Sequence, residues 1–185
     1  MADKLDQIIV IDVEATCWEG HPPANEESEI IEIGLCVVDV QRRERIGRES
    51  IVVKPSRSHV SPFCTQLTGL TQAQVETGIP FAAACQYLRQ HYRTRQRTWA
   101  SYGDYDRRQF ERQCQRDTVP YPFGPTHLNV KNLCALRSTL EHEVSLAKAL
   151  EYCGRRFDGT PHRGVDDAWN IAGLLILLLH GEKNG

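Results

Sequence analysis

The sequence predicts one mixed α/β domain, residues 1–185, in which an antiparallel meander is followed by parallel strands joined by helices. Three apolar, β-branched segments before residue 56 are separated by polar connections, which is typical of an antiparallel meander. Beyond residue 70, segments with helical spacing alternate with short strand-like segments, which predicts parallel strands with helical crossovers. No repeat, linker or low-complexity stretch divides the 185 residues, so a single domain is expected.

The individual elements follow from local patterns along the chain. The expected strands, each apolar and bounded by turn residues, are 7–13, 29–39, 48–55, 98–102 and 127–130. The expected helices, each with apolar residues at helical spacing, begin at Thr71 and then cover 81–93, 106–117, 131–140, 145–153 and 165–180. Thr71 and Gln74 form a T-x-x-Q capping box. Ser145 is the N-cap of its helix, and Gly154 follows the end of the same helix.

Composition excludes several classes of protein. Hydrophobic residues make up 41% of the chain and charged residues 25%, which is typical of a globular protein. The longest apolar run, Leu174 to Leu179, falls far short of the ~18 residues of a membrane span, and no secretory signal opens the chain. We therefore expect no membrane partner. Seven cysteines without a CxxC pair indicate reduced thiols and a cytoplasmic location, and argue against zinc fingers.

The distribution of charge is uneven although the net charge is only −2. Acidic residues dominate 1–32, whereas residues 89–116 contain eight arginines. Arginine binds phosphate groups bidentately, so this segment could contact a polyanion. A solvated helix face explains most of these arginines equally well. Charge alone therefore leaves the partner open.

Acidic residues stand at the ends of apolar elements, where chemistry could use them. Asp12 and Glu14 follow a buried strand and, two residues apart, leave it from the same face. Two carboxylates so placed repel each other and lose hydration, which favours a cation between them. Asp166 and Asp167 open the last helix, shortly after His162. For Asp166, complementing the helix dipole is the better account; for Asp167 that account and a functional one are both open.

Such a constellation matches the needs of hard divalent cations. Mg²⁺ and Mn²⁺ take oxygen ligands, often carboxylates together with phosphate and water. Two such ions ~4 Å apart can activate a water and stabilise the leaving oxygen of a phosphodiester. A nearby histidine such as His162 could take the proton from that water. The residues therefore predict metal-dependent phosphodiester hydrolysis.

Three motifs in order resemble those of the DEDDh-type 3′→5′ exonucleases, the superfamily of oligoribonuclease, RNase T and the proofreading exonucleases. The D-x-E motif stands at Asp12 to Glu14, and "YDRRQF" matches the second motif with its acid at Asp106. The H-x4-D motif spans His162 to Asp167. Several stretches resemble the subgroup that trims histone-mRNA 3′ ends and small RNAs: "DVEATCWEGHPP", "EIIEIG", "SPFCTQLTGLTQAQV" and "DGTPHRGVDDAWNIA". The resemblance extends from residue 8 to about 180.

This resemblance implies a ribonuclease H-like fold, one exonuclease domain over 1–185, and a set of site residues. It assigns Asp12, Glu14 and Asp167 to one of two divalent cations, Mg²⁺ or Mn²⁺, and Asp12 with Asp106 to the second. His162 becomes the general base. The backbone of Ala15 and Thr16 and the side chain of Leu67 become contacts to the terminal nucleotide. Asp104 makes the second motif ambiguous by two residues; Tyr105, directly before Asp106, favours Asp106.

The implied partner is the 3′ end of single-stranded nucleic acid, RNA in preference to DNA, which is degraded to 5′-mononucleotides that can also bind as products. The oligomeric state is not predicted by the sequence. Three alternatives stay open: an RNA-binding module without turnover, a two-metal phosphohydrolase acting on nucleotides, and a structural scaffold. The intact acids and histidine argue against the first. Stepwise shortening of a labelled oligomer excludes the second, and metal-dependent melting excludes the third.

Overall fold

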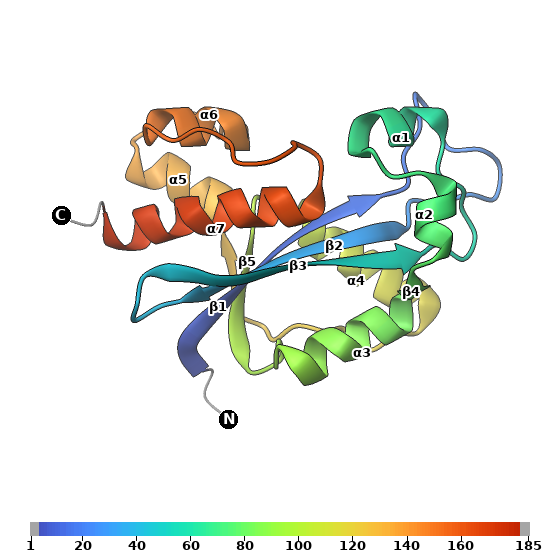
Figure 1. Cartoon of the computed structure of the whole chain (residues 1–185), viewed down its shortest axis with the longest axis horizontal. Helices are drawn as coiled ribbons and strands as arrows, with labels where there is room; N and C mark the ends of the chain where they lie inside the picture. Colours follow the sequence, from blue (N-terminus) through green and yellow to red (C-terminus); the bar gives the residue numbers. More distant parts are fainter. Residues whose placement is uncertain (1–3, 182–185) are drawn as a thin grey trace.

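A computed structural model describes residues 4–181 and contains a six-stranded sheet in the order β4-β3-β2-β1-β5-β6 (Figure 1). The strands are β1 (Lys4–Ala15), β2 (Ile30–Asp39), β3 (Glu44–Lys54), β4 (Ile79–Pro80), β5 (Arg97–Ser101) and β6 (His127–Asn129). β2 pairs antiparallel with both β1 and β3, whereas β5 pairs parallel with β1 and β6 pairs parallel with β5. The predicted mixed sheet, antiparallel first and then parallel, is confirmed.

Seven helices are found within residues 4–181. They are α1 (Pro62–Thr68), α2 (Gln72–Glu76), α3 (Phe81–His91), α4 (Tyr105–Asp117), α5 (Val130–Arg137), α6 (Leu146–Tyr152) and α7 (Gly164–His180). Figure 1 shows α5, α6 and α7 over one face of the sheet and α3 and α4 over the other. Within the described part of the chain, no helix combines the length and the apolar character needed to cross a bilayer.

The central strand β1 is apolar on both faces because helices cover both. Ile9 and Ile11 pack in the cluster that includes α3 and α4, whereas Ile8 and Val10 pack in the cluster that includes α7. Side chains alternate along a strand, so even-numbered residues of β1 face α7. Asp12 continues this even-numbered series. The strand periodicity thus directs the acids at its end toward the start of α7.

Two glycines let α7 approach the sheet closely. Gly34 of β2 lies opposite Asp12 of β1 in the register, and a Cβ built on Gly34 would lie 1.8 Å from the carbonyl carbon of Gly164. A Cβ on Gly164 would lie 3.1 Å from the Asp12 carbonyl oxygen. The first turn of α7 therefore contacts the sheet backbone to backbone. This contact brings the acids of α7 to the end of β1.

The structure differs from the expected elements mainly between residues 55 and 80. Helix α1 was not expected; Ser61 caps it by accepting a hydrogen bond from the Cys64 N–H at 3.0 Å, and Pro62 occupies its first turn, where a proline loses no hydrogen bond. Helix α2 carries the predicted Thr71–Gln74 capping box. The two-residue strand β4 is too short for a periodicity to indicate it.

Candidate active site

The end of β1 has one open edge. β1 pairs with β5 only as far as Val10 opposite Ala100, and β5 ends one residue later. The backbone N–H of Val13 donates instead to Asp106 Oδ1 at 2.9 Å. Asp106 lies in the first turn of α4, and its side chain is only 3% exposed. A buried side-chain hydrogen bond thus joins α4 to the end of the central strand.

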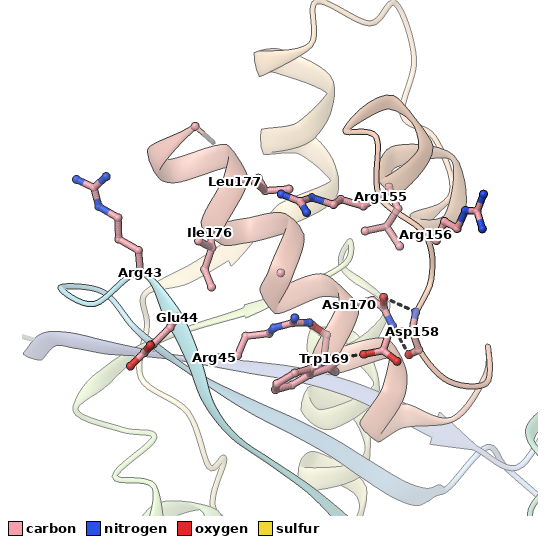
Figure 2. A pocket seen from close by; sticks show the side chains of 13 residues that line it. Arg43, Glu44, Arg45, Arg155, Arg156, Asp158, Trp169, Asn170, Ile176 and Leu177 are labelled. Atoms are coloured by element: carbon pink, nitrogen blue, oxygen red, sulfur yellow. Dashed lines mark hydrogen bonds between the residues drawn. The ribbon is translucent and has the colours of Figure 1, made fainter. Parts of the chain in front are cut away.

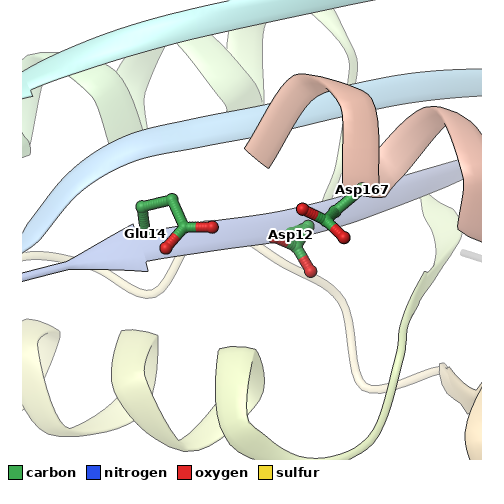
Figure 3. A group of neighbouring side chains, drawn as sticks. All are labelled: Asp12, Glu14 and Asp167. Carbon is green, nitrogen blue, oxygen red and sulfur yellow. The ribbon is translucent and has the colours of Figure 1, made fainter. Parts of the chain in front are cut away.

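Three carboxylates converge at this end from two elements. Asp12 and Glu14 come from β1 and Asp167 from the first turn of α7. One ligand oxygen from each lies within 4.8 Å of the others, and Figure 3 shows the three side chains gathered between strand and helix. The two motifs that are 150 residues apart in sequence are therefore adjacent in space. Asp106 lies beside this group but is not part of it.

All four acids line one pocket of about 320 Å³, which we call the catalytic pocket. This volume lies at the lower end of the range of roughly 300–1,000 Å³ that is usual for small-ligand sites. His162 and Leu67, both expected at the site, line it as well. Leu67 is 39% exposed, so its apolar side chain offers surface on which a ligand can pack. The backbone φ of His162 is +63°, a conformation that is uncommon for a residue other than glycine.

Ala15 and Thr16 were expected together but are placed differently. Ala15 lines the catalytic pocket. Thr16 is fully buried outside it: its N–H donates to the Glu29 carbonyl at 2.8 Å, and its hydroxyl accepts from the Glu29 N–H at 2.9 Å. The Thr16 N–H is therefore not available to a nucleotide. Thr16 thus joins β1 to the segment before β2, and its assignment as a nucleotide contact stays a prediction.

Burial raises the pKa of every carboxylate in the catalytic pocket. Burial, followed by repulsion from Asp106 and Asp167, raises the pKa of Asp12 well above its usual range. Burial, followed by the charge of Asp167, raises the pKa of Glu14 to about 9. Burial also raises the pKa of Asp106 to about 7, although the Val13 N–H opposes it, and that of Asp167 to about 6. The pocket therefore gathers acids whose charged forms the protein stabilises poorly.

One carboxylate oxygen of the pocket also lacks a hydrogen-bond donor among the described residues. Asp167 Oδ2 is buried and has no hydrogen-bond partner among residues 4–181. A buried carboxylate oxygen without a donor is costly, so it calls for a ligand that the protein itself does not provide. A hard divalent cation fits this donor set, which consists of carboxylate oxygens only. Asp12, Glu14 and Asp167 are the residues that could hold it.

Asp104 and Asp106, between which the second motif is ambiguous, lie in different places. Asp104 precedes α4 and pairs with Arg107 at 3.1 Å outside the catalytic pocket. Asp106 lines the pocket. The aromatic residue before it, Tyr105, also lines the pocket and is 55% exposed. Tyr102 and Leu146 were not anticipated there; Tyr102 follows β5 and its hydroxyl donates to the Val144 carbonyl at 2.8 Å.

A larger hollow lies elsewhere, at the C-terminal half of α7 (Figure 2). It has a volume of about 570 Å³, and its polar walls are mainly arginines. The Arg45 guanidinium stacks on the Trp169 ring at 3.7 Å, and Arg155 and Arg156 come from the segment after α6. Among residues 4–181, the carboxylates that could hold a metal ion gather at Asp12 and not in this hollow. Its chemistry differs from that of the catalytic pocket.

A mixed sheet with carboxylates gathered at the end of its central strand is the arrangement of a ribonuclease H-like nuclease. The chain belongs to the exonuclease family, whose sequence model matches residues 9–175. The resemblance carried by the three motifs is thereby confirmed, and so is the ribonuclease H-like fold. Members of this DEDDh family use divalent metal ions, in keeping with the acidic group at Asp12.

Among curated proteins, the chain is 32% identical to 3′-5′ exoribonuclease 1 of Rattus norvegicus over 184 residues, covering 94% of this chain and 53% of the relative. It is 28% identical to the 3′-5′ exonuclease Snipper of Drosophila melanogaster, covering 93% of this chain and 69% of that protein. The chain spans about half the length of the exoribonuclease 1 relatives that it matches. The similarity therefore concerns their nuclease portion.

Two solved structures resemble the chain throughout. The nuclease domain of 3′hExo, a DEDDh family member bound to rAMP, is 30% identical and superposes with a TM-score of 0.86, covering 96% of this chain and 94% of that domain. A structure that describes 3′-end recognition of a histone mRNA stem-loop by 3′-exonuclease is 29% identical, with a TM-score of 0.83, covering 94% of this chain and 81% of that one. Both share the fold described above.

Proposed function

We propose that this chain is a metal-dependent 3′→5′ exonuclease that removes 5′-mononucleotides from the 3′ end of single-stranded RNA. One observation carries the proposal: oxygens of Asp12, Glu14 and Asp167 lie within 4.8 Å of one another, with one Asp167 oxygen buried and unpartnered among the described residues. Ionised carboxylates so close together repel one another, and cations among them relieve that repulsion. The name of the relatives called 3′-5′ exoribonuclease 1 supports RNA as the substrate class.

The acids would divide between two cations, Mg²⁺ or Mn²⁺. Asp12, Glu14 and Asp167 would hold one ion, and Asp12 with Asp106 the other. Bound divalent cations supply Lewis acidity for hydrolysis of a phosphodiester. The Val13 N–H donates to one oxygen of Asp106 and thereby fixes the orientation of that carboxylate. The pocket therefore depends on the backbone of β1 as well as on its side chains.

The remaining pocket residues suit the other tasks of the reaction. His162 lines the pocket and is solvent-exposed, so its imidazole can accept the proton of an attacking water and release it to solvent. Leu67 and Tyr105, 39% and 55% exposed, offer apolar surface on which a terminal base can pack. Ala15 brings the backbone of β1 within reach of the sugar.

A time course on a 5′-labelled single-stranded RNA tests this function. Wild-type protein with Mg²⁺ or Mn²⁺ should shorten the RNA one nucleotide at a time and release 5′-mononucleotides. EDTA should abolish the products, and Asp12→Ala should do the same while the circular dichroism spectrum stays native. A 3′-phosphate should block the reaction, and matched DNA measures the preference for RNA.

Two results would contradict the proposal. Undiminished cleavage in EDTA would end the metal-dependent interpretation of the acids. Cleavage of a circular RNA at an appreciable rate would make the protein an endonuclease, because a circle has no 3′ end.

A further inference from the structure

A second hollow opens directly beside the catalytic pocket. Its volume is about 540 Å³, and it shares the lining residues Tyr102 and Tyr105 with the catalytic pocket, so the two hollows adjoin. Its other walls come from α4, from the start of α5 and from the connection between α5 and α6. A polymer whose 3′-terminal nucleotide occupies the catalytic pocket must leave it by a continuous path. A strand that leaves the catalytic pocket past Tyr102 and Tyr105 enters this hollow.

The wall formed by α4 is a stripe of one aromatic and two cationic side chains. Tyr105, Arg108 and Arg112 are exposed and recur at intervals of three and four residues, which places them on one face of the helix. The opposite face buries Phe110 and Cys114 against the sheet. Arg108 and Arg112 are one helical turn apart, a rise of about 6 Å. This rise is close to the spacing of successive phosphates in an extended strand.

The two arginines of this stripe are not neutralised by neighbouring acids. Within residues 4–181, neither Arg108 nor Arg112 makes an ion pair, and Arg112 donates only to the Gln109 amide oxygen. The carboxylate of Asp104 also borders the hollow, but it is occupied by Arg107 at 3.1 Å. Both guanidinium groups are therefore free to receive phosphate oxygens, which they bind in bidentate geometry.

The facing wall carries a cation that is partly neutralised. Lys131 of α5 pairs with Glu143 at 3.2 Å, and their side chains are 32% and 46% exposed. A pair this exposed is weak, since water screens it and both side chains lose freedom in forming it. A phosphate entering the hollow can therefore displace Glu143 from Lys131. Lys131 is therefore a third cation that a phosphate can reach, and Glu143 is a carboxylate beside the same path.

We propose that the groove formed by Arg108, Arg112, Lys131 and Glu143, the basic groove, binds the phosphates of the nucleotides that precede the 3′ end of a single strand. Glu143 competes with that strand for Lys131 and so lowers its affinity. This inference rests on the proposed exonuclease function, because it assumes that the 3′-terminal nucleotide lies in the catalytic pocket. It adds a binding site of its own, for sugar-phosphate backbone rather than for a base.

The test measures binding rather than turnover. The full chain carrying Asp12→Asn keeps the strand intact, and fluorescence anisotropy with a labelled ten-nucleotide RNA in Mg²⁺ gives the dissociation constant at several salt concentrations. Adding Arg108→Ala and Arg112→Ala should weaken binding and reduce the slope of log K against log salt by about 1.4, because each phosphate that an arginine neutralises accounts for roughly 0.7 of that slope. Binding of adenosine 5′-monophosphate should stay the same, because a mononucleotide does not reach the groove.

A change of opposite sign tests the role of Glu143. Glu143→Gln removes the competing charge and nearly preserves the shape of the side chain, so it should tighten binding of the ten-nucleotide RNA. The matched control is Arg155→Ala with Arg156→Ala, which removes the same number of positive charges from the distant hollow of Figure 2. It should leave the affinity and the salt slope near those of the starting protein.

Several outcomes would overturn the inference. An unchanged affinity in the Arg108/Arg112 variant would do so, and so would an equal loss in the Arg155/Arg156 control, which would indicate a general effect of charge. Weaker binding of the mononucleotide would place these arginines at the terminal nucleotide instead. Failure of the exonuclease function gives a different pattern: wild-type protein would shorten no RNA, whatever the variants do to binding.

Discussion

Glu14 and Glu32 lie directly opposite each other on β1 and β2, and their exposures are 9% and 0%. Their surroundings nevertheless differ. Glu32 accepts hydrogen bonds from Arg163 Nη2 and from the Gly164 N–H, both at 3.0 Å, and from the Ser50 hydroxyl. For Glu14 the structure shows no such donor within residues 4–181, and its pKa is raised to about 9 by burial, followed by the charge of neighbouring acids.

Glu29 extends the comparison. It is 1% exposed, and burial by itself would raise its pKa, but N–H donors from Ser56, Arg57 and Ser58 outweigh burial and hold the pKa below its usual range. We call Glu29 and Glu32 the structural acids, and Asp12, Glu14, Asp106 and Asp167 the pocket acids. Burial alone does not separate the two sets. The balance between protein donors and like charges does: donors hold the pKa of Glu29 low, whereas burial and neighbouring acids raise the pKa of every pocket acid.

The largest expected effect separates Asp106 from its neighbour. Asp106→Asn should lower the rate of RNA shortening by several orders of magnitude, because it removes a pocket acid. Asp104→Asn, the matched control two residues away, should change the rate little, since Asp104 faces Arg107. Urea unfolding should show no loss of stability for Asp106→Asn in metal-free buffer, where the substitution relieves repulsion. The opposite ranking of the two rates would move the site to Asp104.

The next prediction concerns His162, a residue of the catalytic pocket that carries no negative charge. Removing a general base typically lowers a rate by ~10²–10⁴-fold, and we expect this for His162→Asn. Asparagine tolerates the backbone φ of +63° found at this position, so the loop conformation is retained. The rise in melting temperature on adding Mg²⁺ should persist, because the acids remain. A near-wild-type rate would assign the proton transfer to another group.

Replacing a structural acid should destabilise the fold, whereas replacing a pocket acid should not. Glu32→Ala leaves Arg163 and the Gly164 N–H without their partner, and we expect a loss of about 3 kcal/mol in the free energy of unfolding. This is the lower end of the usual range, because the Arg163 side chain is 33% exposed and can regain water. Urea unfolding measures the loss. A variant as stable as wild type would show that donors do not distinguish the two sets.

The smallest expected effect is a dependence of stability on pH. The pocket acids have raised pKa values, so without metal their contribution is complete below the unfolded pKa of about 4 and is lost as pH rises through about 6, 7 and 9. The rise in melting temperature caused by Mg²⁺ should therefore be larger at pH 8 than at pH 5. Glu29 has a lowered pKa, so its contribution is lost instead as pH falls below about 4.5.

Asp12→Asn provides the control for this pH dependence. It should flatten the decline in metal-free stability between pH 6 and 9, because it removes one of the acids whose pKa is raised by burial and by the charges of Asp106 and Asp167. An equal decline in this variant would show that the dependence arises elsewhere in the chain.

The sequence was sufficient to predict the pocket acids because each motif is local. A strand places residues two apart on one face, and a helix start presents its first-turn acids, so spacing alone indicates the geometry at Asp12 and Asp167. The mixed sheet followed from the same periodicities. The roles assigned to these residues stay predictions, whereas their convergence is a property of the fold.

The structural acids could not be identified in the same way. Glu29 and Glu32 belong, by sequence, to an N-terminal segment that is acidic throughout. Their position within the apolar run "EIIEIG" is a signal of burial, but their partners Arg116 and Arg163 lie 87 and 131 residues away. Contacts at such separation depend on tertiary packing. Tyr102 and Leu146 in the catalytic pocket were missed for the same reason.

The contact between Gly34 and Gly164 has a consequence for how substitutions would be tolerated along this chain. Any side chain at position 34 places a Cβ 1.8 Å from the backbone of Gly164 and must displace the start of α7, which carries Asp167. In a saturation mutagenesis experiment that selects for nuclease activity, position 34 should therefore be as intolerant as position 12. A map of such intolerance would mark a residue that bears no ionisable group and takes no part in proton transfer. At position 34, selection for activity would preserve glycine because it lacks a Cβ atom.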